Sequence, residues 1–266
     1  MRKPAVAGYF YEKDGERLKK ELKPYIDLMA PKKKVLAIVS PHAGIKYSGA
    51  VAGAVYSCIQ LPRTFIILGP NHKGIGSPAA LIASGEWEMP NGPIKINSTL
   101  AKAMMASTEY LQEDQYAHAQ EHSLELQLPF IQYLTSDFDI VPAVLQQLDL
   151  SICLEIGTAI ARAIKACDQS VVIVASSDFT HYEPQKIAEA RDRLAIDRIL
   201  TLDPTGLYQT IISNNISMCG FIPAVIALQA TLQMGAAKAD LVKYMTSGDI
   251  TGDYQQVVGY GGIIIC

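Results

Sequence analysis

Histidines follow three apolar segments of the chain, and their side chains could bind a metal ion or transfer a proton. His42, His72 and His181 each lie in a short polar loop that comes directly after a β-rich apolar run. The carboxyl ends of parallel strands meet at one edge of an open α/β sheet, so these loops could converge on one crevice despite their separation in sequence. The three apolar runs are residues 35–40, 64–69 and 171–176.

Cys219 stands immediately before a helical pattern. The positive end of a helix dipole lowers the pKa of such a cysteine and favours the thiolate, which is the form that ligates a metal or attacks carbon. The alternative is a small buried apolar residue. The five cysteines are an odd number, widely spaced and without a CxxC pair, which indicates reduced thiols rather than a disulfide framework. We therefore expect a chemical role for Cys219 alone.

A second polar group contains two histidines four residues apart. These are His118 and His122, but Ala119 occupies the position at which an HExxH zinc protease carries its glutamate, so no metalloprotease is predicted. Three residues of this group are better suited to hold metal-ligating side chains in place without contacting the metal: Glu121, His122 and Glu125. The reason is that metal-bound imidazoles commonly donate their other N–H to a carboxylate. The alternative is a solvated helix start with favourable acidic residues.

Asp178 shares the loop after the third apolar run with His181. A histidine with a pKa near neutrality could move a proton to or from a bound ligand. Asp178 could fix the tautomer of that histidine or bind the substrate directly. We predict catalytic roles for both residues; the alternative is that they are loop residues bonded to their own turn.

These residues need a scaffold in which strands and helices alternate. The apolar runs are short and continuous, as in strands buried on both faces of a parallel sheet. Helical patterns between them imply a layered α/β fold, with helices on both faces of a central, largely parallel or mixed sheet. No linker, repeat or low-complexity run interrupts residues 1–266, so we expect one domain. The helical patterns cover residues 13–29, 48–59, 98–107, 121–134, 151–167, 185–200, 204–213 and 221–234.

The composition argues against several classes of protein. The chain carries 23 Lys+Arg against 26 Asp+Glu, and its basic residues form no broad face, so nucleic acid is not an expected partner. The longest apolar stretches fall far short of the roughly 18 residues that a spanning helix needs, so no membrane segment is predicted. The N-terminus breaks into aromatic and charged residues before a signal-peptide core could form. We expect a cytoplasmic protein.

Several blocks of the sequence are long and unusual. They are Pro4–Tyr11, Pro41–Gly44 with Tyr47–Gly49, Gly69–His72, Glu121–Glu125, Ser176–Tyr182, Cys219–Gly220 and Val258–Tyr260. In this order they resemble the Memo family, which includes the mediator of ErbB-driven cell motility in animals and the microbial AmmeMemoRadiSam system protein B. The resemblance runs nearly end to end. It implies a three-layer α/β sandwich similar to the catalytic subunit of class III extradiol dioxygenases.

The resemblance also implies a non-haem metal site. In the dioxygenases two histidines and a carboxylate hold Fe(II) and leave positions open for substrate and O₂. The matching residues here are His42, His72 and Cys219, with the cysteine where the dioxygenase has its glutamate. Because a thiolate is softer than a carboxylate, copper and zinc are alternatives to Fe(II). His181 matches a pocket histidine that resembles an acid/base residue in the dioxygenases, and Asp178 lines the same pocket.

Three hypotheses for the function follow. The first is a metal-binding Memo-family protein with an iron-dependent oxidoreductase activity on an unidentified substrate. The second is hydrolysis with Cys219 as nucleophile and His181 as base. The third is a non-catalytic module that binds a peptide or partner protein in the same pocket. The ligand is expected to be a small molecule or a peptide, and the resemblance implies radical-SAM and AMMECR-type protein partners; a homo-oligomer is compatible with the composition.

Overall fold

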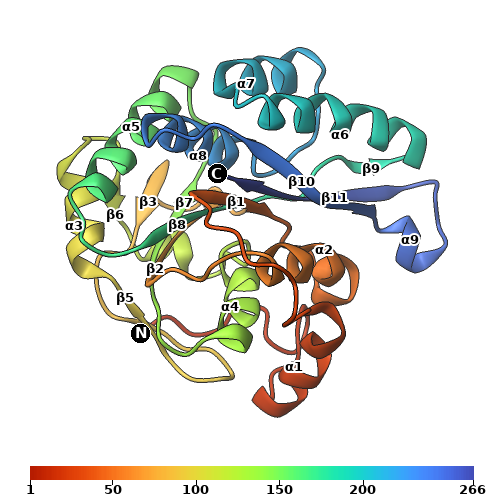
Figure 1. The fold of residues 1–266 in the computed structure, drawn as a ribbon, viewed down its shortest axis with the longest axis horizontal. Coiled ribbons are helices and arrows are strands. Elements are labelled where there is room, and N and C mark those ends of the chain that lie inside the picture. The colour runs from red at the N-terminus through yellow and green to blue at the C-terminus, as the bar shows by residue number, and fades with distance from the viewer.

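The computed structural model describes all 266 residues and is organised around one mixed sheet. The strands are β1 (Ala37–Ser40), β2 (Thr64–Pro70), β3 (Ala79–Leu81), β4 (Glu86–Trp87), β5 (Ile94–Ile96), β6 (Gln112–Glu113), β7 (Asp139–Leu145), β8 (Val171–Ser176), β9 (His181–Glu183), β10 (Ala239–Thr246) and β11 (Val257–Ile265). Their order is β10-β11-β1-β8-β2-β7-β3-β6, with β4, β5 and β9 paired off this path (Figure 1). The four central strands β1, β8, β2 and β7 are parallel, and β11 and β3 flank them in antiparallel orientation.

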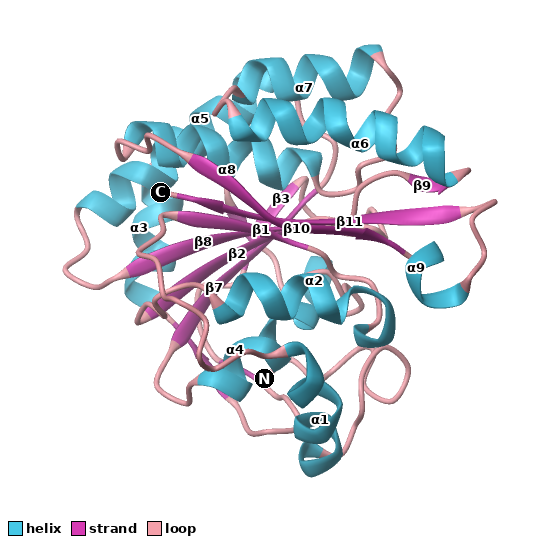
Figure 2. Ribbon diagram, turned by 45° about the vertical axis from the view of Figure 1, so that its right-hand side comes forward, coloured by secondary structure: helices cyan, strands magenta, loops and turns pink.

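Helices cover both faces of the sheet. The α-helices are α1 (Gly15–Leu22), α2 (Ile45–Ser57), α3 (Ser98–Ala106), α4 (Leu128–Leu134), α5 (Leu150–Lys165), α6 (Gln185–Leu200), α7 (Pro204–Ser213), α8 (Phe221–Gln233) and α9 (Gly248–Thr251). Short 3₁₀ turns are η1 (Lys23–Tyr25), η2 (Tyr116–His118) and η3 (Glu125–Gln127). Figure 2 shows α1, α2 and α4 on one side of the strands and α5 to α8 on the other. None of these helices has the length and apolar character needed to cross a membrane.

Alternate residues of the central strands enter two separate cores. Ile66 and Leu68 of β2 pack into the core beneath α5 and α8, whereas Phe65 and Ile67 pack into the core beneath α2 and α4. Successive side chains of a strand point to opposite faces, so a strand covered on both sides must be apolar throughout. This confirms the expected sandwich of a mixed sheet between two helical layers.

Only the second half of the helix predicted for residues 121–134 is α-helical. Helix α4 begins at Leu128, with Pro129 in its first turn, where the missing N–H and fixed φ of proline are tolerated. Ahead of it, the carboxylate of Glu121 accepts the backbone N–H groups of His122 and Ser123, at 2.9 and 2.8 Å. Such side-chain bonds compete with helical bonding. The segment therefore stays a loop that carries His122 to the edge of the sheet.

Candidate metal centre

The ends of three neighbouring parallel strands place the histidine loops side by side. In the sheet β8 lies between β1 and β2 and is parallel to both, so their carboxyl ends share one edge. His42 follows β1, His72 follows β2, and Asp178 follows β8. The convergence of these loops arises from the register of the buried strands, which their continuous apolar sequence brings to the centre of the sheet.

Three imidazoles meet at this edge. His42, His72 and His122 each offer one ring nitrogen, and these atoms lie within 4.8 Å of one another. The rings of His72 and His122 are stacked with centroids 4.6 Å apart, and His42 meets each of them edge-on. From the sequence we expected His122 to support the metal ligands without contacting the metal, whereas the structure brings its ring into the group itself. The pKa of His122 is lowered to about 4, chiefly by burial.

Buried hydrogen bonds orient the ring of His42. The hydroxyl of Ser176 donates to the carbonyl oxygen of Ser123 at 2.7 Å, so it must accept from Nδ1 of His42, 2.9 Å away. Nε2 of His42 is therefore left with a free lone pair. Burial, followed by the neighbouring histidines, lowers the pKa of His42 well below its usual range and keeps the ring neutral. A neutral imidazole is the form that ligates a metal.

Glu121 orients His72 in the same sense. One carboxylate oxygen accepts Nδ1–H of His72 at 2.9 Å and the other accepts the backbone N–H of the same residue at 2.7 Å. Burial by itself raises the pKa of Glu121, but the hydrogen bond and charge of His72 and the N–H of Ser123 outweigh it, and the pKa falls to about 2. Glu121 is thus an anion, and Nε2 of His72 is free for a ligand.

Cys219 lies next to His42 at the start of helix α8. Its Sγ is 3.2 Å from Nε2 of His42 and accepts the backbone N–H of Asp178 at 3.3 Å. Gly220 allows this approach, because a Cβ there would lie 2.2 Å from the carbonyl oxygen of Ser176. Burial, then the charge of Asp178, raises the pKa of the Cys219 thiol well above its usual range. Desolvation thus outweighs the helix end that was expected to lower this pKa.

Asp178 and His181 face different partners. Oδ1 of Asp178 accepts the backbone N–H groups of His42 and Ala43, at 2.8 and 3.3 Å, and burial raises the pKa of this carboxyl. The imidazole of His181 bonds through Nδ1 to the carbonyl oxygen of Ser217 at 2.9 Å. A carbonyl can only accept, so Nδ1 of His181 carries the proton and Nε2 is free. The tautomer of His181 is therefore set by Ser217 rather than by Asp178.

Comparison with known proteins places this arrangement in a family. A family model described as "Memo-like protein" matches residues 2–264. The chain belongs to the Memo family. It is 41% identical to a MEMO1 family protein of Methanothermobacter thermautotrophicus, with 98% of each chain covered. It is 42% identical to one of Methanopyrus kandleri and 40% identical to one of Aquifex aeolicus, each match covering 99% of this chain and 98% of the relative.

In this Memo-family chain, Glu125 supports the N-terminal segment rather than an imidazole. Its buried carboxylate forms an ion pair with Arg2 and accepts from the backbone N–H groups of Ala5 and Val6 and from the hydroxyl of Tyr11. Arg2 also donates through Nε to the carbonyl oxygen of His118 at 3.1 Å and through Nη2 to that of Glu121. The loop that carries His122 is thus tied to the N-terminus.

Sequence reasoning missed Arg2 and the part that His122 takes in the Memo-family site. Arg2 sits in a run of Arg-Lys that resembles any solvated N-terminus, and only the buried carboxylate 123 residues away pairs with its guanidinium. Phe10 gave no local signal either, although its ring meets that of His122 at 5.0 Å. Glu121 and Glu125 were expected to orient the site or to lie at a solvated helix start, and neither interpretation pointed to Arg2.

The donor atoms fit a transition-metal ion. Imidazole nitrogens suit zinc, copper and iron, and a thiolate adds preference for soft ions. His42 and His72 have their Nδ1 atoms occupied by hydrogen bonds, so each offers Nε2, and carboxylate or hydroxyl partners of this kind are what hold metal-binding imidazoles in place. The group formed by His42, His72 and His122 could therefore hold a metal ion.

Proposed function

We propose that this Memo-family protein binds a single transition-metal ion and uses it in oxidoreductase chemistry on a small-molecule ligand. His42, His72 and Cys219 are the proposed ligands, with His122 beside them. Fe(II) is the proposed ion, with copper and zinc as alternatives. The observation that carries the proposal is the convergence of the three imidazoles and the Cys219 thiol at the carboxyl edge of parallel strands.

When bound, such an ion supplies a Lewis acid and, for iron or copper, a redox centre with open positions for a ligand. Residues of the protein orient the metal ligands and move protons. Glu121 and Ser176 hold the rings of His72 and His42 in the tautomer that presents Nε2. His181, with Nδ1 donating to Ser217, can accept a proton from the ligand at Nε2. Asp178 holds the backbone of the His42 loop.

Metal analysis of protein purified without oxygen tests the proposal. We expect about one equivalent of metal in the wild type and its loss in a His42→Ala/Cys219→Ser double variant, because two of the proposed donors are removed. His181→Ala is the matched control and should retain the metal, since its ring is not among the proposed ligands. With ascorbate supplied as the electron donor, the iron-loaded wild type should consume O₂, and the double variant should not. Unchanged metal content in the double variant would refute the assignment of His42 and Cys219 as metal ligands.

A non-catalytic binding module is the second candidate. Exposed tyrosines stand next to residues of the site: Tyr9 is 90% exposed and precedes Phe10, which contacts His122, and Tyr182 is 73% exposed and follows His181. Exposed aromatic side chains are common anchors in peptide recognition. This candidate predicts ligand binding without turnover, so the discovery of a substrate that the metal-loaded protein converts would displace it.

Hydrolysis by a cysteine and a histidine has less support. The imidazole next to the Cys219 thiol is that of His42, whose Nε2 is 3.2 Å from Sγ, and not that of His181. The raised pKa of the thiol also works against a nucleophilic thiolate. Alkylation of Cys219 by a mild reagent in metal-free protein, together with activity that survives a chelator, would restore this alternative.

A further inference from the structure

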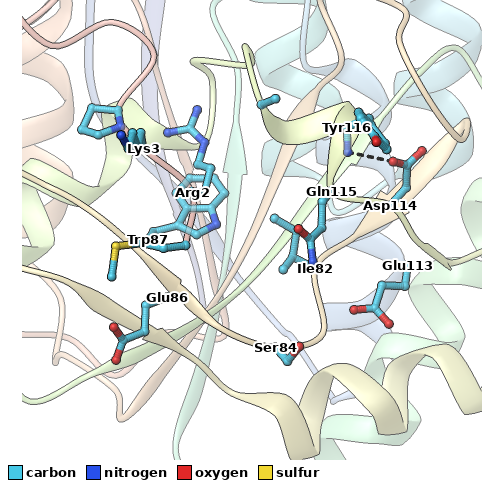
Figure 3. Close-up of a pocket in the computed structure, with 13 residues that line it drawn as sticks. Arg2, Lys3, Ile82, Ser84, Glu86, Trp87, Glu113, Asp114, Gln115 and Tyr116 are labelled. Atoms are coloured by element: carbon cyan, nitrogen blue, oxygen red, sulfur yellow. Dashed lines mark hydrogen bonds between the residues drawn. The ribbon is translucent and has the colours of Figure 1, made fainter.

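A cavity of about 880 Å³ lies beside the N-terminal segment. Its walls are residues 1–4, the strand β4 with the segment before it, and the end of β6 with the segment that follows it (Figure 3). None of the residues of the histidine group lines it. A cavity of this size that combines apolar surface with a few polar groups is a typical small-molecule site.

Unpaired charges of both signs line this cavity. Figure 3 shows Lys3 on one side and Glu113 on the other, with Glu86 below Trp87. Lys3, Glu86 and Glu113 form no ion pair and no side-chain hydrogen bond within the chain, in contrast to Arg2, which is neutralised by Glu125. Lys3 and Glu113 thus face each other across the cavity, and both are free for a ligand.

A buried donor without a partner lies at the floor. Trp87 is 1% exposed, and its indole Nε1 has no hydrogen-bond acceptor. In Figure 3 this nitrogen is on the side of the ring that faces Ile82 and Gln115. One face of the indole ring is covered by the guanidinium of Arg2, whose Cζ lies 4.3 Å from the ring centroid. A buried N–H costs free energy until it finds an acceptor, so the floor calls for an oxygen atom from an occupant.

We propose that this cavity binds a zwitterionic ligand of the short-peptide class. The ligand carboxylate pairs with Lys3, its ammonium pairs with Glu113, and an amide carbonyl between them accepts from Nε1 of Trp87. Three extended residues span about 10 Å, and a sphere of the cavity volume would be about 12 Å across. An anion alone or a cation alone would leave one charged wall unpaired.

Trp87 also makes the proposal measurable, because it is the only tryptophan in the chain. Trialanine is the probe, added to the full-length protein while Trp87 emission and the heat of binding are recorded in parallel. We expect a saturable change in both signals. N-acetyl-trialanine lacks the ammonium and trialanine amide lacks the carboxylate, so each should bind about fivefold more weakly, as expected for the loss of one partly exposed ion pair.

Substitutions on the two walls separate this site from adventitious binding. Lys3→Gln and Glu113→Gln change exposed side chains, so they should leave the fold intact and each weaken trialanine binding about fivefold. Asp168→Asn removes an exposed carboxylate outside the cavity and should leave binding unchanged. Absence of saturation up to about 10 mM trialanine would overturn the proposal. So would equal affinities of the free and capped peptides, or saturable heat that neither wall variant alters.

Discussion

Glu121 binds both the ring and the backbone of His72, through Nδ1–H at 2.9 Å and the amide N–H at 2.7 Å. The same carboxylate accepts the amides of His122 and Ser123, so one buried anion sets the position of two of the three imidazoles. A rigid arrangement of donors lowers the cost of ordering them when an ion binds.

Replacing this anion should weaken metal binding. Glu121→Gln keeps the shape of the side chain, but its NH₂ group cannot accept the N–H donors that now meet both oxygens. We expect the affinity for Zn(II) or Fe(II), measured by competition with a chromogenic chelator, to fall about 10- to 100-fold. Glu88→Gln, at an exposed position, is the control. Equal affinities of wild type and Glu121→Gln would show that Glu121 does not orient the ligands.

Cys219 should act as a metal ligand that light absorption can detect. Cobalt(II) substituted into the wild type is expected to show a thiolate-to-cobalt charge-transfer band in the near ultraviolet. Cys219→Ser should lose that band and bind copper more weakly, because an alcohol is a harder and poorer donor than a thiolate. Cys153→Ser is a matched substitution of a cysteine outside the site. If the band persists in Cys219→Ser, the sulfur is not a ligand.

Removal of Arg2 should destabilise the whole fold. Arg2→Met leaves the buried carboxylate of Glu125 without its cation, and breaking one side of a buried pair costs about 3–5 kcal/mol. Denaturation in urea measures the free energy of unfolding. Arg63→Met removes an arginine whose pair with Asp137 is exposed and should cost less than about 1 kcal/mol. Similar losses in the two variants would contradict the buried, structural role of Arg2.

His118 should make the protein sensitive to acid. Burial lowers its pKa from 6.5 to about 4, so between these values the unfolded chain binds a proton that the folded chain excludes. Stability is therefore fully present above about pH 6.5 and falls towards pH 4, by up to about 3 kcal/mol from this residue. In metal-free protein, the difference in unfolding free energy between wild type and His118→Gln should shrink across this window. Curves that stay parallel would refute the assignment.

Local sequence was sufficient for the architecture and for the residues at the strand ends. Continuous, β-rich apolar runs such as 64–69 favour strands covered on both faces, and their alternation with helical patterns implies parallel strands. On that basis we expected His42 and His72 to leave the sheet at one edge, and they do. The helix expected at 121–134 shows where this reasoning stops, because the carboxylate of Glu121 diverts the backbone into a loop.

What local pattern does not encode is which distant groups bond to each other. Three features of the site depend on contacts between residues far apart in the chain. They are the inward position of His122, the partner of the His181 ring and the approach of Cys219 to His42. Burial likewise raises the pKa of Cys219, and the position of this residue at a helix start does not predict that burial. The sequence by itself determined which strands end in histidines. Tertiary structure decided which side chains meet there, because loop conformation follows from long-range hydrogen bonds and burial rather than from local propensity.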